Sequence, residues 1–171
     1  MEIRRVEINE LEKVMEVIND AKAFLKLQSK QWQQGYPNHD SMSNDIYNHN
    51  LFGVYDNNEL VCVAALIVGI EKTYVNMIEG SWEIDVSPKD LVIHRIAISN
   101  KYRGKGYAKA MMKFAESYAR LNNCESIKVD THRVNIPMQN LMLSCGYKKR
   151  GIIDLNRNEE DQLRDAYELV I

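Results

Sequence analysis

The spacing of apolar residues along the 171-residue chain changes repeatedly between the periods of strand and helix. Alternation over 2–8 predicts a strand, and helical spacing from Leu11 to Leu25 predicts a helix capped by Asn9. Residues 29–40 break the pattern and predict a loop, before a short helix over 41–50. Apolar runs at 51–55 and 60–68, separated by a turn at 56–58, predict a β-hairpin.

The second half of the chain alternates predicted strands and helices. The pattern predicts one or two strands over 74–86 and a central strand over 91–99, before a glycine loop and a helix that runs to Ala119. A strand follows over 126–130, then a helix that Asn135 and Pro137 open and Gly146 closes. Strands over 147–153 and 166–171, joined through 156–165, complete a single α/β or α+β domain over 1–171.

Composition narrows the class of protein. Apolar residues make up 45% and charged residues 27% of the chain, which is typical of a soluble globular domain. The net charge of −2 gives no electrostatic case for nucleic acid or an anionic membrane, and the apolar run over 60–70 is too short to span a bilayer. Three cysteines without metal-site spacing favour a reducing compartment. We therefore expect a cytoplasmic protein without a metal.

The stretch SNKYRGKGYAKAMM places two glycines and several cations immediately before a predicted helix. Gly104 and Gly106 allow the backbone to curl so that successive N–H groups face one anion, and the helix start adds its dipole. Arg103 and Lys105 would add positive charge. The alternative is an exposed turn whose cations only aid solubility. The stretch lacks the residues of a Walker A loop and the third glycine of a dinucleotide fingerprint.

Two signatures resemble those of the GNAT family, the GCN5-related N-acetyltransferases. Residues 103–108 are similar to its Arg/Gln-x-x-Gly-x-Gly/Ala motif, and they follow an apolar strand, as that family requires. The segment NIPMQNLMLSCGY is similar to Asn-x-x-Ala-x-x-Leu-Tyr-x-x-x-Gly-Phe, with Asn135, Leu141 and Gly146 matching and Tyr147 in place of Phe. The resemblance covers about 91–153.

The resemblance implies the GNAT fold, with a central mixed, mostly antiparallel sheet of about six to seven strands flanked by helices. It also implies acetyl-CoA as cosubstrate and a possible homodimer. The implied cofactor-binding residues are Ile96, Ala97 and Ile98, whose main chain would pair with pantetheine, and Arg103, Gly104, Lys105, Gly106, Tyr107 and Ala108, whose amides would hold the pyrophosphate. Asn135 would hydrogen-bond the pantetheine, cap its own helix, or do both.

The implied reaction is direct attack of an amine on the thioester, which needs a base because an ammonium has no lone pair. His94 is the first candidate, since strand alternation would put it on the face of Ile96 and some family members have a histidine there. A histidine satisfied within the sheet is the alternative. Glu83 and Asp85 are the other candidate bases. Arg95, on the opposite face, would be an ion-pair partner or a cation of the acceptor pocket.

The family's general acid, a tyrosine of the second signature, is replaced here by Met142, which cannot donate a proton. Nearby Tyr147, Ser144 or Cys145 would have to substitute for it. This departure keeps a second hypothesis open: an acyl-CoA-binding regulatory module without turnover. A third hypothesis is an interaction protein whose basic loop is only a solvated turn.

Four further residues are candidates for holding the amine acceptor. Trp32 and Tyr36 lie in the predicted loop over 29–40, where they would bind the acceptor or cover the core above the first helix. Asp130 and His132 end a predicted strand and would add polar contacts. Aromatic faces with few carboxylates favour a small amine, an amino acid or a peptide end over a polycation. The sequence therefore predicts an acetyl-CoA-dependent N-acetyltransferase acting on a primary amine.

Overall fold

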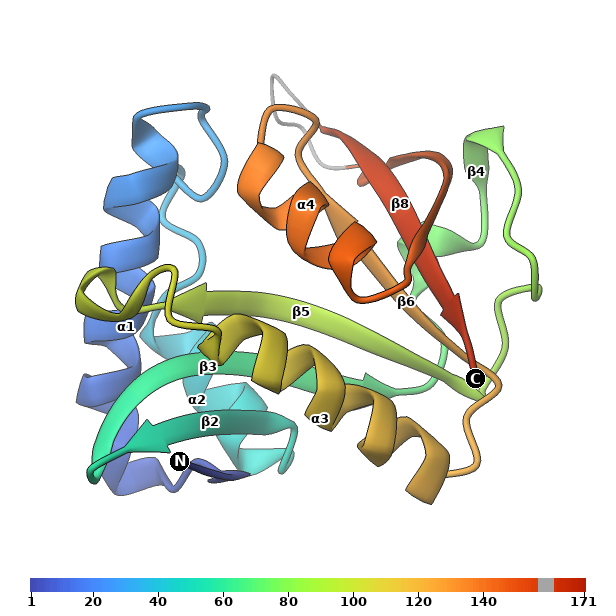
Figure 1. The fold of residues 1–171 in the computed structure, drawn as a ribbon. Helices are drawn as coiled ribbons and strands as arrows, with labels where there is room; N and C mark the ends of the chain where they lie inside the picture. Colours follow the sequence, from blue (N-terminus) through green and yellow to red (C-terminus); the bar gives the residue numbers. More distant parts are fainter. Residues whose placement is uncertain (157–161) are drawn as a thin grey trace. The chain divides into compact units, whose positions relative to one another are not determined.

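The computed structural model describes residues 1–156 and 162–171 (Figure 1). The strands are β1 (Glu2–Arg5), β2 (Leu51–Asp56), β3 (Glu59–Val68), β4 (Met77–Gly80), β5 (Asp90–Ile98), β6 (Ser126–Thr131), β7 (Lys148–Asp154) and β8 (Leu163–Val170). The helices are α1 (Leu11–Lys26), α2 (His39–Tyr47), α3 (Tyr107–Leu121) and α4 (Ile136–Ser144), with short 3-10 turns η1 (Ile8–Glu10), η2 (Lys72–Tyr74) and η3 (Asn100–Tyr102).

The strands form one sheet in the order β1-β2-β3-β5-β6-β8-β7-β4. Strand β5 pairs with β6 in parallel over Asp90–Val92, while β1–β2, β2–β3, β6–β8, β7–β8 and β4–β7 are antiparallel. This confirms the mixed, mostly antiparallel sheet with flanking helices. The described residues contain eight strands, so the expected six to seven was too few. Two of the eight, β1 and β4, are only four residues long.

Several predicted boundaries in the first half were wrong. The first strand ends at Arg5, because Glu7 and Glu10 form a reciprocal capping box around the 3-10 turn η1. Asn9 therefore lies inside that turn and does not cap α1. The second helix begins at His39, since the side chain of Asn38 accepts the Ser41 N–H at 2.9 Å. The hairpin turn is confirmed, and both of its central asparagines have positive φ.

The second half matches the prediction except in two segments. Of residues 74–86, only Met77–Gly80 forms a strand, and 81–89 has no regular structure. Strand β8 begins at Leu163, three residues before the predicted start. The predicted connection over 156–165 includes 157–161, which lie outside the described residues. In the part of the chain that the structure describes, no helix combines the length and apolar character needed to cross a membrane.

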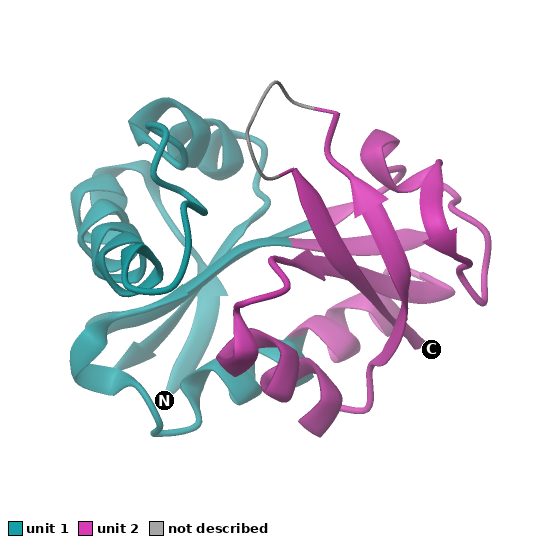
Figure 2. Ribbon diagram, turned by 90° about the horizontal axis from the view of Figure 1, so that it is seen from above, with its two compact units in different colours: residues 1–66, 94–114 teal, residues 67–93, 115–171 magenta. Residues whose placement is uncertain are grey.

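The chain divides into two compact units (Figure 2). Unit 1 comprises 1–66 and 94–114, and unit 2 comprises 67–93 and 115–171, so β3, β5 and α3 contribute residues to both. In unit 1, apolar residues of α1 and α2 pack with Leu51, Val63 and Ala97 in one core. The Phe52 ring lies 5.2 Å from that of Phe114 on α3. All but the last residue of β2 are buried as a result.

Candidate active site

The main chain of the glycine loop between β5 and α3 is unobstructed beside its two glycines. Gly104 and Gly106 have φ of 75° and 88°, in the left-handed region where a side chain is strained. No atom lies within 4 Å of where a Cβ would stand on either glycine, so that side of the loop is open. Because α3 begins at Tyr107, the N–H groups of its first turn have no acceptor within the helix. The Lys105 N–H donates to the Tyr102 carbonyl at 3.4 Å, within the loop.

Side chains of α1 hold the start of this loop. The Asp20 carboxylate accepts the Asn100 N–H at 2.8 Å and the Ser99 hydroxyl at 3.0 Å. The Arg103 guanidinium lies 3.8 Å from the Phe24 ring centre and donates from Nε to the Asn100 side chain at 2.9 Å. In Figure 1 this loop runs beside α1. The Arg103 side chain is thus turned towards α1. Only the main-chain N–H of Arg103 is then left to bind an anion at the loop.

The β2–β3 hairpin holds the other end of the loop. The Tyr107 hydroxyl donates to Asp56 at 2.6 Å, and the Tyr102 hydroxyl donates to Glu59 at 2.7 Å. These hydrogen bonds raise the pKa of both tyrosines. The Lys105 ammonium lies 4.9 Å from the Tyr102 ring centre. Polar side chains at both ends therefore fix the conformation of the loop. A turn that serves only to be solvated does not need such contacts.

Strand β5 is irregular at Arg95, immediately before the residues expected to pair with pantetheine. Arg95 has φ of 53°, a conformation that costs a non-glycine residue roughly 1–2 kcal/mol. Regular alternation requires extended backbone at every residue, so alternation does not place His94 and Ile96 on one face across Arg95. Ala97 lies in the unit 1 core, while His94, Ile96 and Ile98 are half-buried.

Arg95 is an ion-pair partner, one of the two roles expected for it. Its Nε and Nη2 donate to the two carboxylate oxygens of Asp45 on α2, at 2.6 and 2.7 Å. Its Nη1 donates to the Tyr36 hydroxyl at 2.6 Å. Trp32 is partly buried against the unit 1 core, which agrees with the alternative in which it covers that core. Unit 1 thus contains His94, the part of β5 that follows it, the glycine loop and Tyr36, which is bonded to β5 through Arg95.

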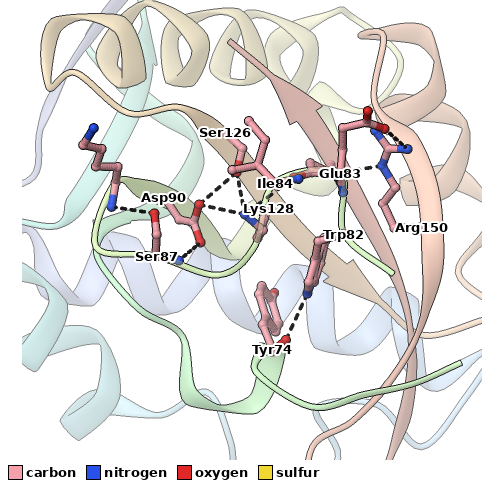
Figure 3. Close-up of polar contacts among 11 residues, drawn as sticks. Tyr74, Trp82, Glu83, Ile84, Ser87, Asp90, Ser126, Lys128 and Arg150 are labelled. Atoms are coloured by element: carbon pink, nitrogen blue, oxygen red, sulfur yellow. Dashed lines mark hydrogen bonds and ion pairs between the residues drawn. The ribbon is translucent and has the colours of Figure 1, made fainter. Parts of the chain in front are cut away.

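Glu83 and Asp85, the other candidate bases, lie in unit 2 on the irregular segment 81–89. The Glu83 N–H donates to Glu168 at 2.8 Å, and its carboxylate is paired with Arg150 at 2.9 Å, as Figure 3 shows. Asp85 is exposed. The Ile84 N–H also donates to Glu168, at 3.2 Å. A buried carboxylate on β8 therefore fixes the backbone that carries Glu83.

Three more of the predicted residues make structural hydrogen bonds in unit 2. Asp130 accepts the Tyr74 hydroxyl at 2.5 Å, and burial is the main cause that raises the pKa of Tyr74. His132 is buried, and its Nδ1 accepts the backbone N–H two residues further on at 3.2 Å. Asn135 accepts the Met138 N–H at 3.4 Å, which confirms its role as the cap of α4. The described residues hold no cluster of three or more metal-ligating side chains.

Tyr147 and Met142 are both buried, with 2% and 0% of their surface exposed. Among the described residues, no partner hydrogen-bonds the Tyr147 hydroxyl. Burial is the main cause that raises the pKa of Tyr147, so the phenol keeps its proton over the whole working pH range. Met142 has no proton to donate. It is a buried residue of α4 and stands at the position of the family's tyrosine.

Sequence reasoning missed the residues that brace these segments: Asp20, Asp45, Asp56, Glu59, Glu168 and Arg150. No sequence signal distinguishes them, because a single acidic or basic residue on a helix, strand or turn is usually solvated.

Comparison with known proteins places the chain in a family. Residues 14–147 match the model of the acetyltransferase (GNAT) family. The crystal structure of a GNAT acetyltransferase from Streptococcus agalactiae 2603 superposes with a TM-score of 0.88 at 32% identity, covering 99% of this chain and 95% of that one. A PaiA N-acetyltransferase from Thermoplasma acidophilum shares the fold, with a TM-score of 0.71 at 16% identity, covering 99% of this chain and 98% of that one.

Among curated proteins, a streptothricin acetyltransferase from Escherichia coli is 34% identical over 74 residues, which are 43% of this chain. The match spans 42% of that relative's own length. The family model covers the glycine loop, β5 and α4 together, and the structural match extends over nearly the whole chain. The chain belongs to the GNAT family of acetyltransferases.

Proposed function

We propose that the chain is an acetyl-CoA-dependent N-acetyltransferase that transfers acetyl to a primary amine of a small molecule, an amino acid or a peptide. The observation that carries this proposal is the glycine loop, whose side chains are engaged by α1 and the β2–β3 hairpin while its glycines face open space. A main chain fixed in this way is suited to a diphosphate.

The residues present fit coenzyme A at this loop. A Cβ on Gly104 or Gly106 would project into the open side, where a phosphate would otherwise approach the amides. The Thermoplasma acidophilum relative was solved in complex with coenzyme A, and membership of the family supports the same ligand here. We assign the pyrophosphate to the amides of residues 103–108 other than Lys105, whose N–H is engaged. We assign the pantetheine arm to the main chain of 96–98.

The proposed chemistry needs a base and an oxyanion donor from this chain. His94 would take a proton from the substrate ammonium, and the freed nitrogen lone pair would then attack the thioester carbon. The carbon–sulfur bond breaks as the amide forms, and the nitrogen gives up its second excess proton to solvent. A backbone N–H of residues 96–98 would stabilise the oxyanion. The departing thiolate leaves without a protein acid at Met142. The three cysteines are free, as the proposed cytoplasmic location would keep them.

Calorimetry with acetyl-CoA tests the loop. The wild type should release heat on binding, and the double variant Gly104→Val/Gly106→Val should release none, because the side chains fill the cradle and strain two positive-φ positions. Gly35→Val is the matched control, since Gly35 has φ of 77° and equally open surroundings but lies outside the glycine loop between β5 and α3. Unchanged binding by the double valine variant would contradict the assignment.

Met142 favours a second candidate function, an acyl-CoA-binding module without turnover. That candidate predicts the same binding heat but no release of free thiol when pooled amines, amino acids and peptides are added. The proposed enzyme predicts thiol release that depends on the amine. An interaction protein would bind no acetyl-CoA at all, so the two measurements separate the three hypotheses.

A further inference from the structure

Arg95 joins three segments of unit 1 through one guanidinium group. Three of its nitrogens donate hydrogen bonds of 2.6–2.7 Å, two to Asp45 and one to the Tyr36 hydroxyl. The side chains of Arg95 and Asp45 are only 13% and 9% exposed. A buried, bidentate guanidinium–carboxylate pair has a fixed geometry, because both groups are planar and each has two matching atoms. The Tyr36 hydroxyl is therefore held at one place relative to β5.

The position of Arg95 along the chain matters as much as its partners. It lies between His94 and Ile96, which carry the proposed base and the proposed oxyanion donors. Its positive φ is a strained conformation that persists only where the surroundings hold it. The two contacts to Asp45 attach this strained residue to a buried position on α2. The third contact extends the attachment to segment 29–38, the loop that carries Tyr36 and Trp32.

We propose that Arg95 is a positioning residue that fixes the acceptor-side segment 29–38 against the strand that presents the acetyl group. This inference rests on the proposed function and adds to it how the amine is aligned. Displacement of a bound group by about 1 Å can cost a reaction on the order of 100-fold. A rigid link from the β5 irregularity to the acceptor loop prevents such displacement.

A second cluster of an arginine, a carboxylate and a tyrosine supplies a matched comparison. Arg4 donates to both oxygens of Glu10 at 2.9 and 3.0 Å, and the Tyr55 hydroxyl donates to Glu10 at 3.0 Å. This cluster joins β1, η1 and β2 and includes no residue assigned to acetyl-CoA or the amine. Tyr55→Phe therefore removes one hydroxyl from an Arg–carboxylate–Tyr cluster in the same unit without touching the proposed link.

The test compares Tyr36→Phe, Arg95→Lys and their double variant with Tyr55→Phe. Hydrogen exchange read by mass spectrometry should show the amides of 29–38 exchanging about tenfold faster in Tyr36→Phe and Arg95→Lys, but not in Tyr55→Phe. Lysine keeps the charge but lacks the fork that serves Asp45 and Tyr36 together. With any amine that the wild type acetylates, KM for the amine should rise about tenfold and kcat should fall, while the Kd of acetyl-CoA stays within twofold.

The double variant separates positioning through Tyr36 from independent effects. If Arg95 acts through Tyr36, the kcat/KM of Arg95→Lys/Tyr36→Phe should match that of the weaker single variant, whereas multiplied losses would overturn the proposal. Unchanged exchange over 29–38, or full activity in Arg95→Lys, would also overturn it. If the wild type binds acetyl-CoA but acetylates no amine, the proposed function fails, and the exchange measurement alone decides whether Arg95 fixes the segment.

Discussion

Replacing Lys128 by methionine removes a charge from the interior of unit 2. The Lys128 ammonium donates to Asp90 at 2.7 Å and to the Ser126 hydroxyl at 2.6 Å, and it lies 3.5 Å from Glu168 (Figure 3). None of the surface of the Lys128 side chain is exposed, and Asp90 and Glu168 are equally inaccessible. The centre of the Trp82 ring lies 5.4 Å from the Lys128 ammonium nitrogen. Solvent therefore cannot replace the missing ammonium.

The expected loss is large because the carboxylates stay behind. Breaking a buried ion pair from one side costs about 3–5 kcal/mol, since an uncompensated charge remains buried. For a chain of this size, each kcal/mol lowers Tm by roughly 2–4 °C, so Lys128→Met should lower Tm by about 6–20 °C. The amides of Glu83 and Ile84, which donate to Glu168, should exchange faster in the same variant.

Calorimetric Tm and urea midpoints measure the effect. Lys89→Met is the control, because the Lys89–Glu125 pair belongs to the same unit but its side chains are 62% and 47% exposed. Such a pair contributes about 0–1 kcal/mol. Lys128→Met/Asp90→Asn should recover part of the loss, since it also removes one stranded charge. If Lys128→Met cost no more than Lys89→Met, the cluster would be solvated and the reasoning from burial would be refuted.

Three other predictions follow from single side chains. Hydrogen bonds from Arg4 lower the pKa of Glu10 from 4.5 to about 2, so its contribution is complete above pH 4.5 and disappears as the pH falls towards 2. Glu10→Gln should make the urea midpoint nearly independent of pH across that window, a difference of about 1 kcal/mol because the pair is partly exposed to solvent. Tyr147→Phe should raise the free energy of unfolding by about 1 kcal/mol, because it removes a buried hydroxyl that has no hydrogen-bond partner among the described residues; a fall in kcat in this variant would instead assign Tyr147 the acid's role. His94→Ala should lower kcat/KM by about 100-fold or more and flatten its alkaline-rising limb, and a parental pH profile would exclude His94 as base.

Local features of the chain were predictable from the sequence. The hairpin, β5, the glycine loop and the cap of α4 each depend on residues within a few positions of one another. Asn57 and Asn58 accept positive φ in the hairpin turn, and Asn135 caps the helix that it begins. In each case the residue types and their spacing already contain the physical cause.

Features held by distant residues were not predictable. Residues 81–86 were expected to belong to a strand, but the backbone of Glu83 and Ile84 is bonded to Glu168, more than 80 residues away in the chain. Lys128 alternates like any polar strand residue, and no local pattern reveals that a buried Asp90 faces it. The same applies to Arg95, whose side chain bonds to Asp45 and Tyr36 in two other segments of the chain.

The presence of Met142 in place of an acid affects the proposed activity only as much as the missing proton transfer slows the reaction. That effect can be compared with the effect of a missing base. A thiol with an ordinary pKa of about 8.5 leaves as thiolate at pH 7 with a penalty of about 2 kcal/mol, or roughly 30-fold in rate. An amine with an ordinary pKa of about 10.4 must lose a proton at a cost of about 4–5 kcal/mol, or more than 1,000-fold. The replacement of the family's tyrosine by a buried methionine therefore removes the cheaper of the two proton transfers. Turnover depends far more on the base, so the pH profile of His94→Ala weighs more on the enzymatic proposal than any substitution at Met142.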